Sequence, residues 1–208
     1  MAQLDGKVAV ITGTGLGAAT AKLSAREGAA VPLVGRRGEA RGSCRCHRIR
    51  GRALVAADPA TPTRAADESL KKFGGIDILV NNAGLHAAPY PLHETPLDEW
   101  NRFLAVHLTS PFLSTRAVVP SMIERRDGAI VNIGSMVALI GFKGNSAYAA
   151  AKGGLVSMTR TTAVDYAPYG IRANSSARTG WSPSSTATSP KSSSPDCTRL
   201  LTWPVARC

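Results

Sequence analysis

The chain has 208 residues and a formal net charge of +11, and 44% of its residues are hydrophobic. This length suits one α/β domain with a substantial core, and no apolar run approaches the roughly 18 residues of a membrane span, so we expect no membrane-spanning helix. The charge suggests a nucleic-acid partner, but nearly all of it lies in residues 36–52 and 171–208, which also hold all four cysteines. Because the excess charge belongs to two segments, we do not expect nucleic acid to be bound. The opening residues, MAQLDGKVAVITG, include no basic and apolar leader, so we expect a cytoplasmic protein.

A glycine-rich turn connects the first expected strand, residues 7–12, to a helix expected over 17–28. Glycine lets the backbone turn tightly, and the free N–H groups of a helix N-terminus bind the pyrophosphate of a dinucleotide. The spacing Gly-x-Gly-x-x-Ala over residues 13–18 fits the fingerprint of such turns. We therefore expect the whole turn to contact a dinucleotide: Gly13, Thr14, Gly15, Leu16 and Gly17.

Two arginines follow the second expected strand, residues 30–34. In dinucleotide-binding folds an acidic residue at this place binds the ribose 2′-hydroxyl of NAD. Here Arg36 and Arg37 stand instead, and guanidinium groups bind a phosphate in a bidentate way. The sequence therefore predicts NADP as the cofactor, with NAD as the alternative.

The segment 36–52 contains seven arginines and one acidic residue. It has no apolar stripe at helical spacing, so we expect it to be irregular and to precede a third strand at 54–57. Cys44, Cys46 and His47 lie close together, but no second pair with ligand spacing accompanies them, and we expect no metal site. A nucleic-acid patch is the alternative for the arginines, although no aromatic residues lie among them to stack on bases.

The fourth expected strand, residues 76–80, ends in the turn Asn81-Asn82-Ala83-Gly84. Small side chains at a strand end allow a ligand to lie close to the backbone. A turn that only packs the end of the strand is the structural alternative at each of these positions.

The next segment predicts a helix with Thr95 as its cap and Pro96 in its first turn. Apolar residues recur along it at helical spacing, and His107 falls on the same inward face. Pro111 has no N–H, so the carbonyl of residue 107 lacks its usual donor four residues later. A proton-relay role for His107 and a packed core histidine both remain open.

The stretch from residue 129 to residue 152 contains the candidate catalytic residues. Residues 129–133 predict a short buried strand with Ser135 at its end, and the helix that begins at Ser146 holds Tyr148 and Lys152 one turn apart. A free tyrosine has a pKa of about 10, and a nearby positive charge favours the phenolate. A phenol, a cation and a hydroxyl together can transfer a proton to or from a carbinol oxygen. Tyrosine and lysine at this spacing are also common on ordinary helix faces, so the interpretation depends on the other motifs.

Taken in order, the glycine turn, the Asn-Asn-Ala-Gly turn, Ser135, Tyr148, Lys152 and the segment 169–174 resemble the short-chain dehydrogenase/reductase (SDR) family. The resemblance covers residues 1–35 and 53–174. It implies an α/β fold with a Rossmann-type, doubly wound parallel sheet in three layers and the strand order 3-2-1-4-5. It also implies an NAD(P)-dependent oxidoreductase that transfers a hydride between nicotinamide C4 and a carbonyl or secondary alcohol.

The resemblance further implies roles for individual residues. Tyr148 would be the acid/base and would also contact the cofactor, Lys152 would support it and hold the nicotinamide ribose, and Ser135 would orient the substrate oxygen. Four more cofactor contacts are implied, at Asp58, Asn82, Ala83 and Gly84. The family has asparagine where this chain has His107. Its glycine turn is also two residues longer than the turn of this chain, so a turn that still binds phosphate, though more weakly, and a damaged turn both remain open. The family assembles through the helices that correspond to 98–126 and 146–166, so a homo-oligomer, a dimer or tetramer, is expected.

The C-terminal part departs from the family pattern. Residues 175–194 contain nine serines with interspersed proline and threonine, and they show neither helical nor strand periodicity. Such a stretch buries too little apolar surface to offset the entropy of ordering. We therefore expect a domain over 1–174 with a frayed or absent sixth strand, and a disordered low-complexity tail over 175–208. A shifted coding frame would produce this composition, and a catalytically impaired dinucleotide-binding protein is the alternative function.

Overall fold

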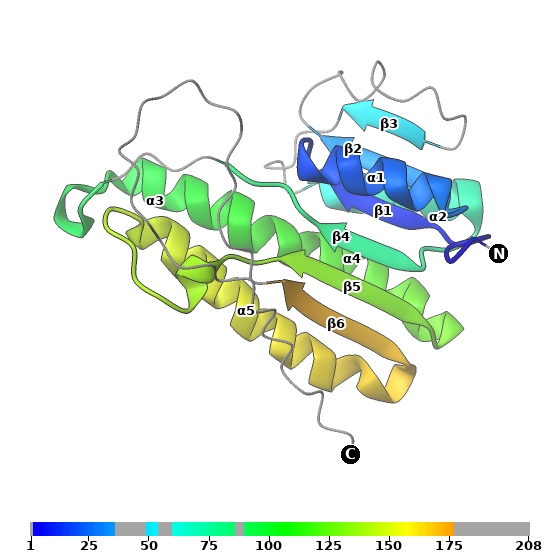
Figure 1. Ribbon diagram of the computed structural model, residues 1–208. Coiled ribbons are helices and arrows are strands. Elements are labelled where there is room, and N and C mark those ends of the chain that lie inside the picture. Colours follow the sequence, from blue (N-terminus) through cyan, green and yellow to red (C-terminus); the bar gives the residue numbers. More distant parts are fainter. Residues whose placement is uncertain (1, 36–48, 54–59, 86–89, 177–208) are drawn as a thin grey trace.

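The computed structural model describes residues 2–35, 49–53, 60–85 and 90–176. Six parallel strands form one sheet in the order β3-β2-β1-β4-β5-β6, from one edge to the other (Figure 1). The first five strands follow the predicted order 3-2-1-4-5, although the third does not occupy its predicted residues, and the α/β doubly wound fold is confirmed. The strands are β1 (Ala9–Thr12), β2 (Val31–Gly35), β3 (Ile49–Ala53), β4 (Ile78–Asn81), β5 (Gly128–Ile133) and β6 (Ile171–Ser176).

Helices cover both faces of the sheet, in three layers. The α-helices are α1 (Leu16–Arg26), α2 (Ala60–Phe73), α3 (Leu97–Leu104), α4 (Ser110–Arg125) and α5 (Ser146–Tyr166). Short turns of helix are η2 (Leu92–Glu94), η3 (Ala105–Thr109), η4 (Met136–Ala138) and η5 (Ala167–Tyr169). In the part of the chain that the structure describes, none of these helices is long and apolar enough to cross a membrane.

Two apolar clusters hold the layers together, because successive side chains of a strand point to opposite faces. On one face, Ile11 of β1 packs with Ala21 and Ala25 of α1. On the other face, Val10 of β1 belongs to a larger cluster that includes Met122 of α4. Since neighbouring residues of β1 serve both clusters, the strand is buried throughout, as expected for the centre of a parallel sheet.

A polar ladder crosses the second face between β4, β5 and α5. Asn81 Nδ2 donates to Asn132 Oδ1 at 2.8 Å, and Asn132 Nδ2 donates to Thr159 Oγ1 at 2.8 Å. Thr159 in turn donates to the carbonyl of Leu155 within α5 at 2.6 Å. Buried polar groups require such partners, so the ladder fixes the position of α5 over the end of β5.

The third strand does not lie where the sequence predicted it. It spans Ile49–Ala53, inside the segment 36–52 that was expected to be irregular, and the predicted position 54–57 lies outside the described residues. Its sequence, IRGRA, alternates arginine with small or apolar residues, which is the period of a strand and not of a helix. Five backbone pairs with β2, from Val31↔Ile49 to Gly35↔Ala53, hold it at the edge of the sheet, where charged residues are tolerated.

The prediction of a frayed or absent sixth strand is wrong. β6 pairs with β5 over six residues, from Gly128↔Ile171 to Ile133↔Ser176, so the ordered sheet extends two residues beyond the expected boundary at 174. Ile171 and Ala173 are buried in the larger cluster and anchor the strand. The two serines that follow are held by backbone pairing, which does not depend on the side chain.

The helix after β4 also begins differently. The Thr95 hydroxyl donates to the carbonyl of Pro91 at 3.0 Å and does not cap the helix, whose N-cap is Pro96. The expected single helix is divided into α3, the π turn η3 and α4. Pro111 has no N–H to donate to the carbonyl of His107. The π turn η3 contains His107, and its hydrogen bonds join residues five apart in the chain instead of four.

Candidate active site

Three turns meet at one edge of the sheet, because the carboxyl ends of parallel strands lie on the same side. β1 leads to Gly13, β4 leads to Asn82 and β5 leads to Ser135, and these three strands are neighbours in the sheet. The sequence motifs therefore come together in space although about 120 residues separate the first from the last. This edge is the place where ligands bind in doubly wound folds.

The glycine turn after β1 is shaped by two backbone conformations that favour glycine. Gly13 has φ 85° and Gly15 has φ 61°. Gly15 is the N-cap of α1, no side chain caps the helix there, and a Cβ built on Gly15 would meet nothing within 4 Å. The N–H of Gly17 donates to the carbonyl of Thr14 at 3.1 Å. The other N–H groups of the first turn have no intrahelical acceptor, and with the open space at Gly15 this helix end is a suitable site for an anion.

The second turn, after β4, is fastened to the first by Asn82. Its side-chain Nδ2 donates to the carbonyl of Thr12 at 2.9 Å and to that of Thr14 at 3.4 Å. In the other direction, the backbone N–H groups of Asn82 and Ala83 donate to Thr12 Oγ1 at 3.0 and 3.1 Å. Two of the predicted cofactor residues therefore build the frame of the glycine turn.

Thr12 was not among the predicted site residues. Its hydroxyl accepts from two amides of the neighbouring turn and donates to the carbonyl of Val80 at 3.4 Å, so it connects β1 to the end of β4. The only signal in the sequence is a hydroxyl residue at the last position of the first strand. A threonine there suits a strand in any protein, so only the three-dimensional pairing shows its role.

Ser135 follows β5 in an extended conformation and begins η4. Its Oγ accepts a long hydrogen bond of 3.4 Å from the N–H of Val137, and the residue is half-buried. The helix α5 packs against η4. The serine hydroxyl therefore lies at the strand end that α5 covers, where the sequence placed it.

Tyr148 and Lys152 lie on the first two turns of α5. Lys152 is only 5% exposed, and its Nζ donates to the carbonyl of Ile133, two residues before Ser135. The same Nζ lies 5.8 Å from the centroid of the Tyr148 ring. Burial lowers the pKa of Lys152 to about 8, so the amine is still mainly an ammonium at neutral pH.

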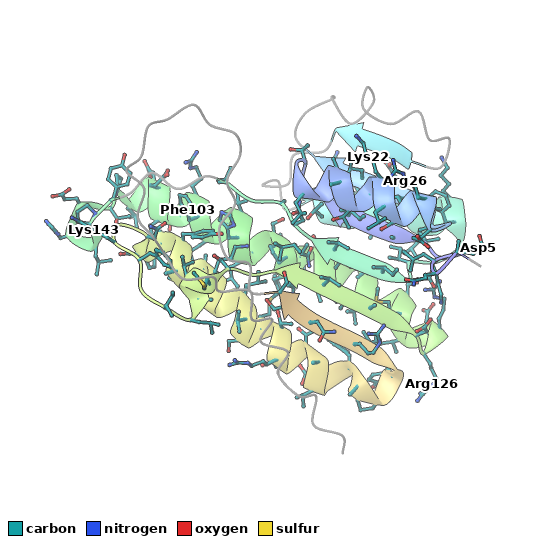
Figure 2. The ribbon with its side chains drawn as sticks, in the orientation of Figure 1. Asp5, Lys22, Arg26, Phe103, Arg126 and Lys143 are labelled. Carbon is teal, nitrogen blue, oxygen red and sulfur yellow. The ribbon has the colours of Figure 1, made fainter. Side chains whose placement is uncertain are left out.

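The Tyr148 ring is held by two other rings. It forms edge-to-face contacts with His107, with centroids 4.9 Å apart, and with Phe103, with centroids 6.2 Å apart. Figure 2 labels Phe103 on α3, at the end of the molecule where α3 lies beside the start of α5. A shallow cleft opens beside the Phe103 and Tyr148 rings, lined by Tyr90, Thr95, Glu99, Phe103, Gly144, Asn145, Ser146, Ala147 and Tyr148.

Some of the other predicted cofactor residues are exposed at the two turns, and the rest lie outside the described residues. Gly84 is exposed next to His107, and Leu16 and Thr14 are exposed beside the glycine turn. Arg36, Arg37 and Asp58 lie outside the described residues, as do Cys44, Cys46 and His47. The structure therefore brings together the glycine turn, the Asn-Ala-Gly turn and the serine, tyrosine and lysine, and leaves the contacts of Arg36, Arg37 and Asp58 as predictions.

Comparison with known proteins assigns the chain to a family. The family model described as short chain dehydrogenase matches residues 7–192, nearly the whole chain. The chain belongs to the short-chain dehydrogenase family. The resemblance seen in the sequence is therefore confirmed, and the match continues past residue 174 into the serine-rich segment.

The relatives of this chain are named for different alcohols. The chain is 42% identical over 128 residues to the 2-(R)-hydroxypropyl-CoM dehydrogenase of Xanthobacter autotrophicus, covering 61% of this chain and 51% of the relative. It is 38% identical over 182 residues to the D-threitol dehydrogenase of Mycolicibacterium smegmatis, covering 83% and 69%. The chain thus spans about half the length of the first relative and about two thirds of the second.

Solved structures support the fold of this chain. An NAD⁺-bound xylitol dehydrogenase superimposes with a TM-score of 0.79 at 33% identity, covering 83% of this chain and 70% of that chain. A short-chain dehydrogenase from Streptomyces avermitilis gives a TM-score of 0.77 at the same identity, covering 81% and 64%. The described part of the chain therefore has the architecture of its family.

Substituting Gly13 by alanine should disable the glycine turn. A Cβ there would lie 2.8 Å from Ala83 Cα and 2.8 Å from Asn82 Nδ2, and the backbone already has φ 85°. We expect a loss of at least about 1–2 kcal/mol in the free energy of unfolding from the conformation alone, together with weaker nucleotide binding. Chemical denaturation and nucleotide titration measure the two effects. Gly153→Ala in α5, where a Cβ meets nothing within 4 Å, is the control and should not destabilise the protein. A Gly13→Ala protein as stable as this control would contradict the prediction.

Proposed function

We propose that this chain is an NAD(P)-dependent oxidoreductase that interconverts a secondary alcohol and a carbonyl compound. The observation that carries the proposal is the placement of Tyr148 and the buried Lys152 on α5, over the strand end that leads to Ser135. The glycine turn lies at the same edge of the sheet. A proton donor and a dinucleotide site at one edge are what such a reaction requires.

The residues present fit a dinucleotide. The open space at Gly15 and the uncapped N-terminus of α1 suit a pyrophosphate, which the N–H groups and the positive end of the helix would bind. Asn82 holds the turn in this shape. Gly84 offers a surface without a side chain, against which a flat ring could lie.

Each of the three polar residues would have one task in the reaction. The bound nicotinamide supplies or accepts the hydride at its C4 carbon. In reduction, Tyr148 donates its phenolic proton to the carbonyl oxygen, and in oxidation it takes the proton back. Lys152 stabilises the phenolate that reduction leaves behind, because an ammonium a short distance away favours that charge. Ser135 donates a hydrogen bond to the same substrate oxygen and holds it in line with Tyr148.

A secondary alcohol is the substrate class that we propose. The named relatives act on hydroxypropyl-coenzyme M and on threitol, and the solved relative is a xylitol dehydrogenase. These compounds share a secondary alcohol, although threitol and xylitol are linear polyols and hydroxypropyl-CoM is not. Oxidation rates with a panel of polyols, cyclic alcohols and short-chain alcohols would identify the substrate, and the absence of turnover with every member would count against the proposal.

We expect a preference for NADPH over NADH. The prediction comes from Arg36 and Arg37, which follow the second strand where an acidic residue would bind the NAD ribose. Dissociation constants for the two nucleotides, measured by fluorescence titration, should favour NADPH about tenfold or more, since one bidentate arginine–phosphate contact contributes about 1.5–3 kcal/mol. Arg36→Ala with Arg37→Ala should remove the preference. Tighter binding of NADH by the unmodified protein would contradict it.

A catalytically silent nucleotide-binding protein is the second candidate, and the presence of His107 where the family has asparagine favours it. Thermal stabilisation by a nucleotide without turnover of any alcohol or ketone would identify this case.

We also propose a homo-oligomer, since Phe112 of α4 and Val164 of α5 are 45% and 75% exposed on the helices through which the family associates. Light scattering on the purified protein tests that association.

A further inference from the structure

The His107 ring contacts the Tyr148 ring, and the proposed reaction gives His107 no role. It belongs to the π turn η3 and is 2% exposed. Its ring is stacked on Phe103 with centroids 5.4 Å apart and contacts the edge of Tyr148. A polar ring enclosed this deeply beside a reactive group must satisfy both of its nitrogens or bear the cost of leaving one without a partner.

One nitrogen has a partner that fixes the tautomer. The backbone N–H of Leu85 donates to His107 Nε2 at 3.1 Å. A backbone N–H can only donate, so Nε2 carries no hydrogen and the neutral ring must carry its hydrogen on Nδ1. The ring is neutral because burial, with a smaller contribution from the Lys152 charge, lowers the pKa of His107 to about 3.

The other nitrogen is a donor without an acceptor. Among the described residues, no hydrogen bond satisfies His107 Nδ1, although the atom is buried. It lies close to Gly84: a Cβ built on this glycine would be 3.6 Å from Nδ1 and 3.0 Å from Cε1. Gly84 itself is exposed. The backbone of Gly84 therefore separates the unsatisfied Nδ1–H of His107 from the solvent side of the Asn-Ala-Gly turn.

We propose that His107 is a positioning residue with two hydrogen bonds, one to the Leu85 amide through Nε2 and one donated by Nδ1–H to an oxygen acceptor beside Gly84 and Tyr148. The first bond fixes the end of the turn that begins at Asn82. The second holds an oxygen of the bound nucleotide, or of a water molecule, against the face of the site. Only the identity of the ligand rests on the proposed function.

Nuclear magnetic resonance of the full chain labelled with ¹⁵N-histidine tests the tautomer directly. The chain has four histidines, and the His107→Asn variant assigns the signal. We expect Nδ1 to be protonated and Nε2 unprotonated, with no titration between pH 5 and pH 8. The opposite tautomer, or a titration near the ordinary value of about 6.5, would overturn the proposal.

The same signal identifies the acceptor when NADPH or NADH is added. A downfield shift of the Nδ1 proton on addition assigns the acceptor to the nucleotide. A cross-peak between this proton and water, present with and without nucleotide, assigns it to a bound water. A proton that shows neither response would overturn the second half of the proposal.

Two variants separate the two bonds. In His107→Gln the amide oxygen can still accept from the Leu85 N–H, but no donor remains at the position of Nδ1. In His107→Asn a donor remains near that position, but the side chain cannot reach Leu85. We expect His107→Gln to keep the slow hydrogen exchange of the Leu85 amide and to lose about tenfold in kcat, or in nucleotide affinity if the protein has no turnover. We expect His107→Asn to show at least about tenfold faster exchange at Leu85 and to keep kcat within about threefold, since one hydrogen bond of about 1.4 kcal/mol corresponds to a factor of ten.

Equal losses in both variants, on both readouts, would show that His107 only packs the core, and would overturn the proposal. The proposed oxidoreductase activity fails separately. If the unmodified protein turns over no alcohol or ketone, the tautomer and the exchange of the Leu85 amide still decide the role of His107.

Discussion

Tyr148→Phe is expected to lower kcat by about 10²–10⁴-fold, the contribution of a positioned general acid or base. The substitution removes only the phenolic oxygen. The phenylalanine ring can keep the edge contacts with His107 at 4.9 Å and with Phe103 at 6.2 Å, so the packing of α5 should persist. Nucleotide affinity should change little, because the glycine turn and Asn82 are untouched. Steady-state rates of alcohol oxidation and a nucleotide titration on the same protein give both quantities.

Tyr169→Phe provides the matched control for this variant. Tyr169 ends η5 at the opposite end of α5 and is 37% exposed, so loss of its hydroxyl should leave kcat unchanged. Comparable rates in Tyr148→Phe and the unmodified protein would show that another group transfers the proton. A large loss of nucleotide affinity in Tyr148→Phe would instead show that the hydroxyl serves binding.

The local parts of the site could be predicted from the sequence because helix geometry fixes them. Tyr148 and Lys152 are four residues apart, so any helix through both places them one turn apart. Ser135 follows an apolar run that is short enough for a buried strand. Residue spacing and short apolar runs can be read from the sequence alone, and the structure places these three residues on the expected elements.

The parts that depend on distant contacts could not be predicted. Thr12 serves the site only because β1 and β4 are neighbours, which brings its hydroxyl to the amides of Asn82 and Ala83. The edge strand β3 was missed since its arginines suggested an irregular segment, although its alternation has the period of a strand. β6 was underestimated because backbone pairing with β5 stabilises residues whose side chains carry no strand signal.

Lys152→Met is expected to abolish efficient turnover and at the same time to make the protein more stable at neutral pH. The variant removes the ammonium that stabilises the phenolate, so kcat should fall by about 10²-fold or more. It also removes a buried charge, and a side chain that is 5% exposed gains little from solvent. Methionine has a similar length and no polar atom that needs a partner. Function and stability should therefore change in opposite directions.

The pH dependence of stability gives this prediction a sign. The pKa of Lys152 is about 8 in the folded protein against an ordinary value of 10.5. Below pH 8 the lysine is charged in both states, and the folded state bears the full cost of the buried charge. Between about pH 8 and 10.5 the unfolded chain binds more protons, so the contribution of Lys152 to the free energy of unfolding rises with pH through this window.

The magnitude follows from the difference between the two pKa values. Each unit corresponds to about 1.4 kcal/mol, which gives a cost of about 3 kcal/mol at neutral pH. Loss of the hydrogen bond to the Ile133 carbonyl offsets about 1 kcal/mol or more of the gain. We therefore expect Lys152→Met to raise the free energy of unfolding at pH 7 by about 1–2 kcal/mol. We also expect the rise between pH 8 and 10.5 to be lost, in urea denaturation measured across that range.

Lys143→Met is the control, since Lys143 lies exposed in the loop before α5 and should contribute no such rise. If Lys152→Met keeps the same rise in stability above pH 8 as the unmodified protein, the Lys152 amine is not buried when the protein is in solution. A lysine open to solvent would not hold the carbonyl of Ile133, and its ammonium would no longer be fixed between the end of β5 and the Tyr148 ring. The stability curve of one variant thus tests the geometry on which the proposed proton transfer depends, without any assay of the reaction.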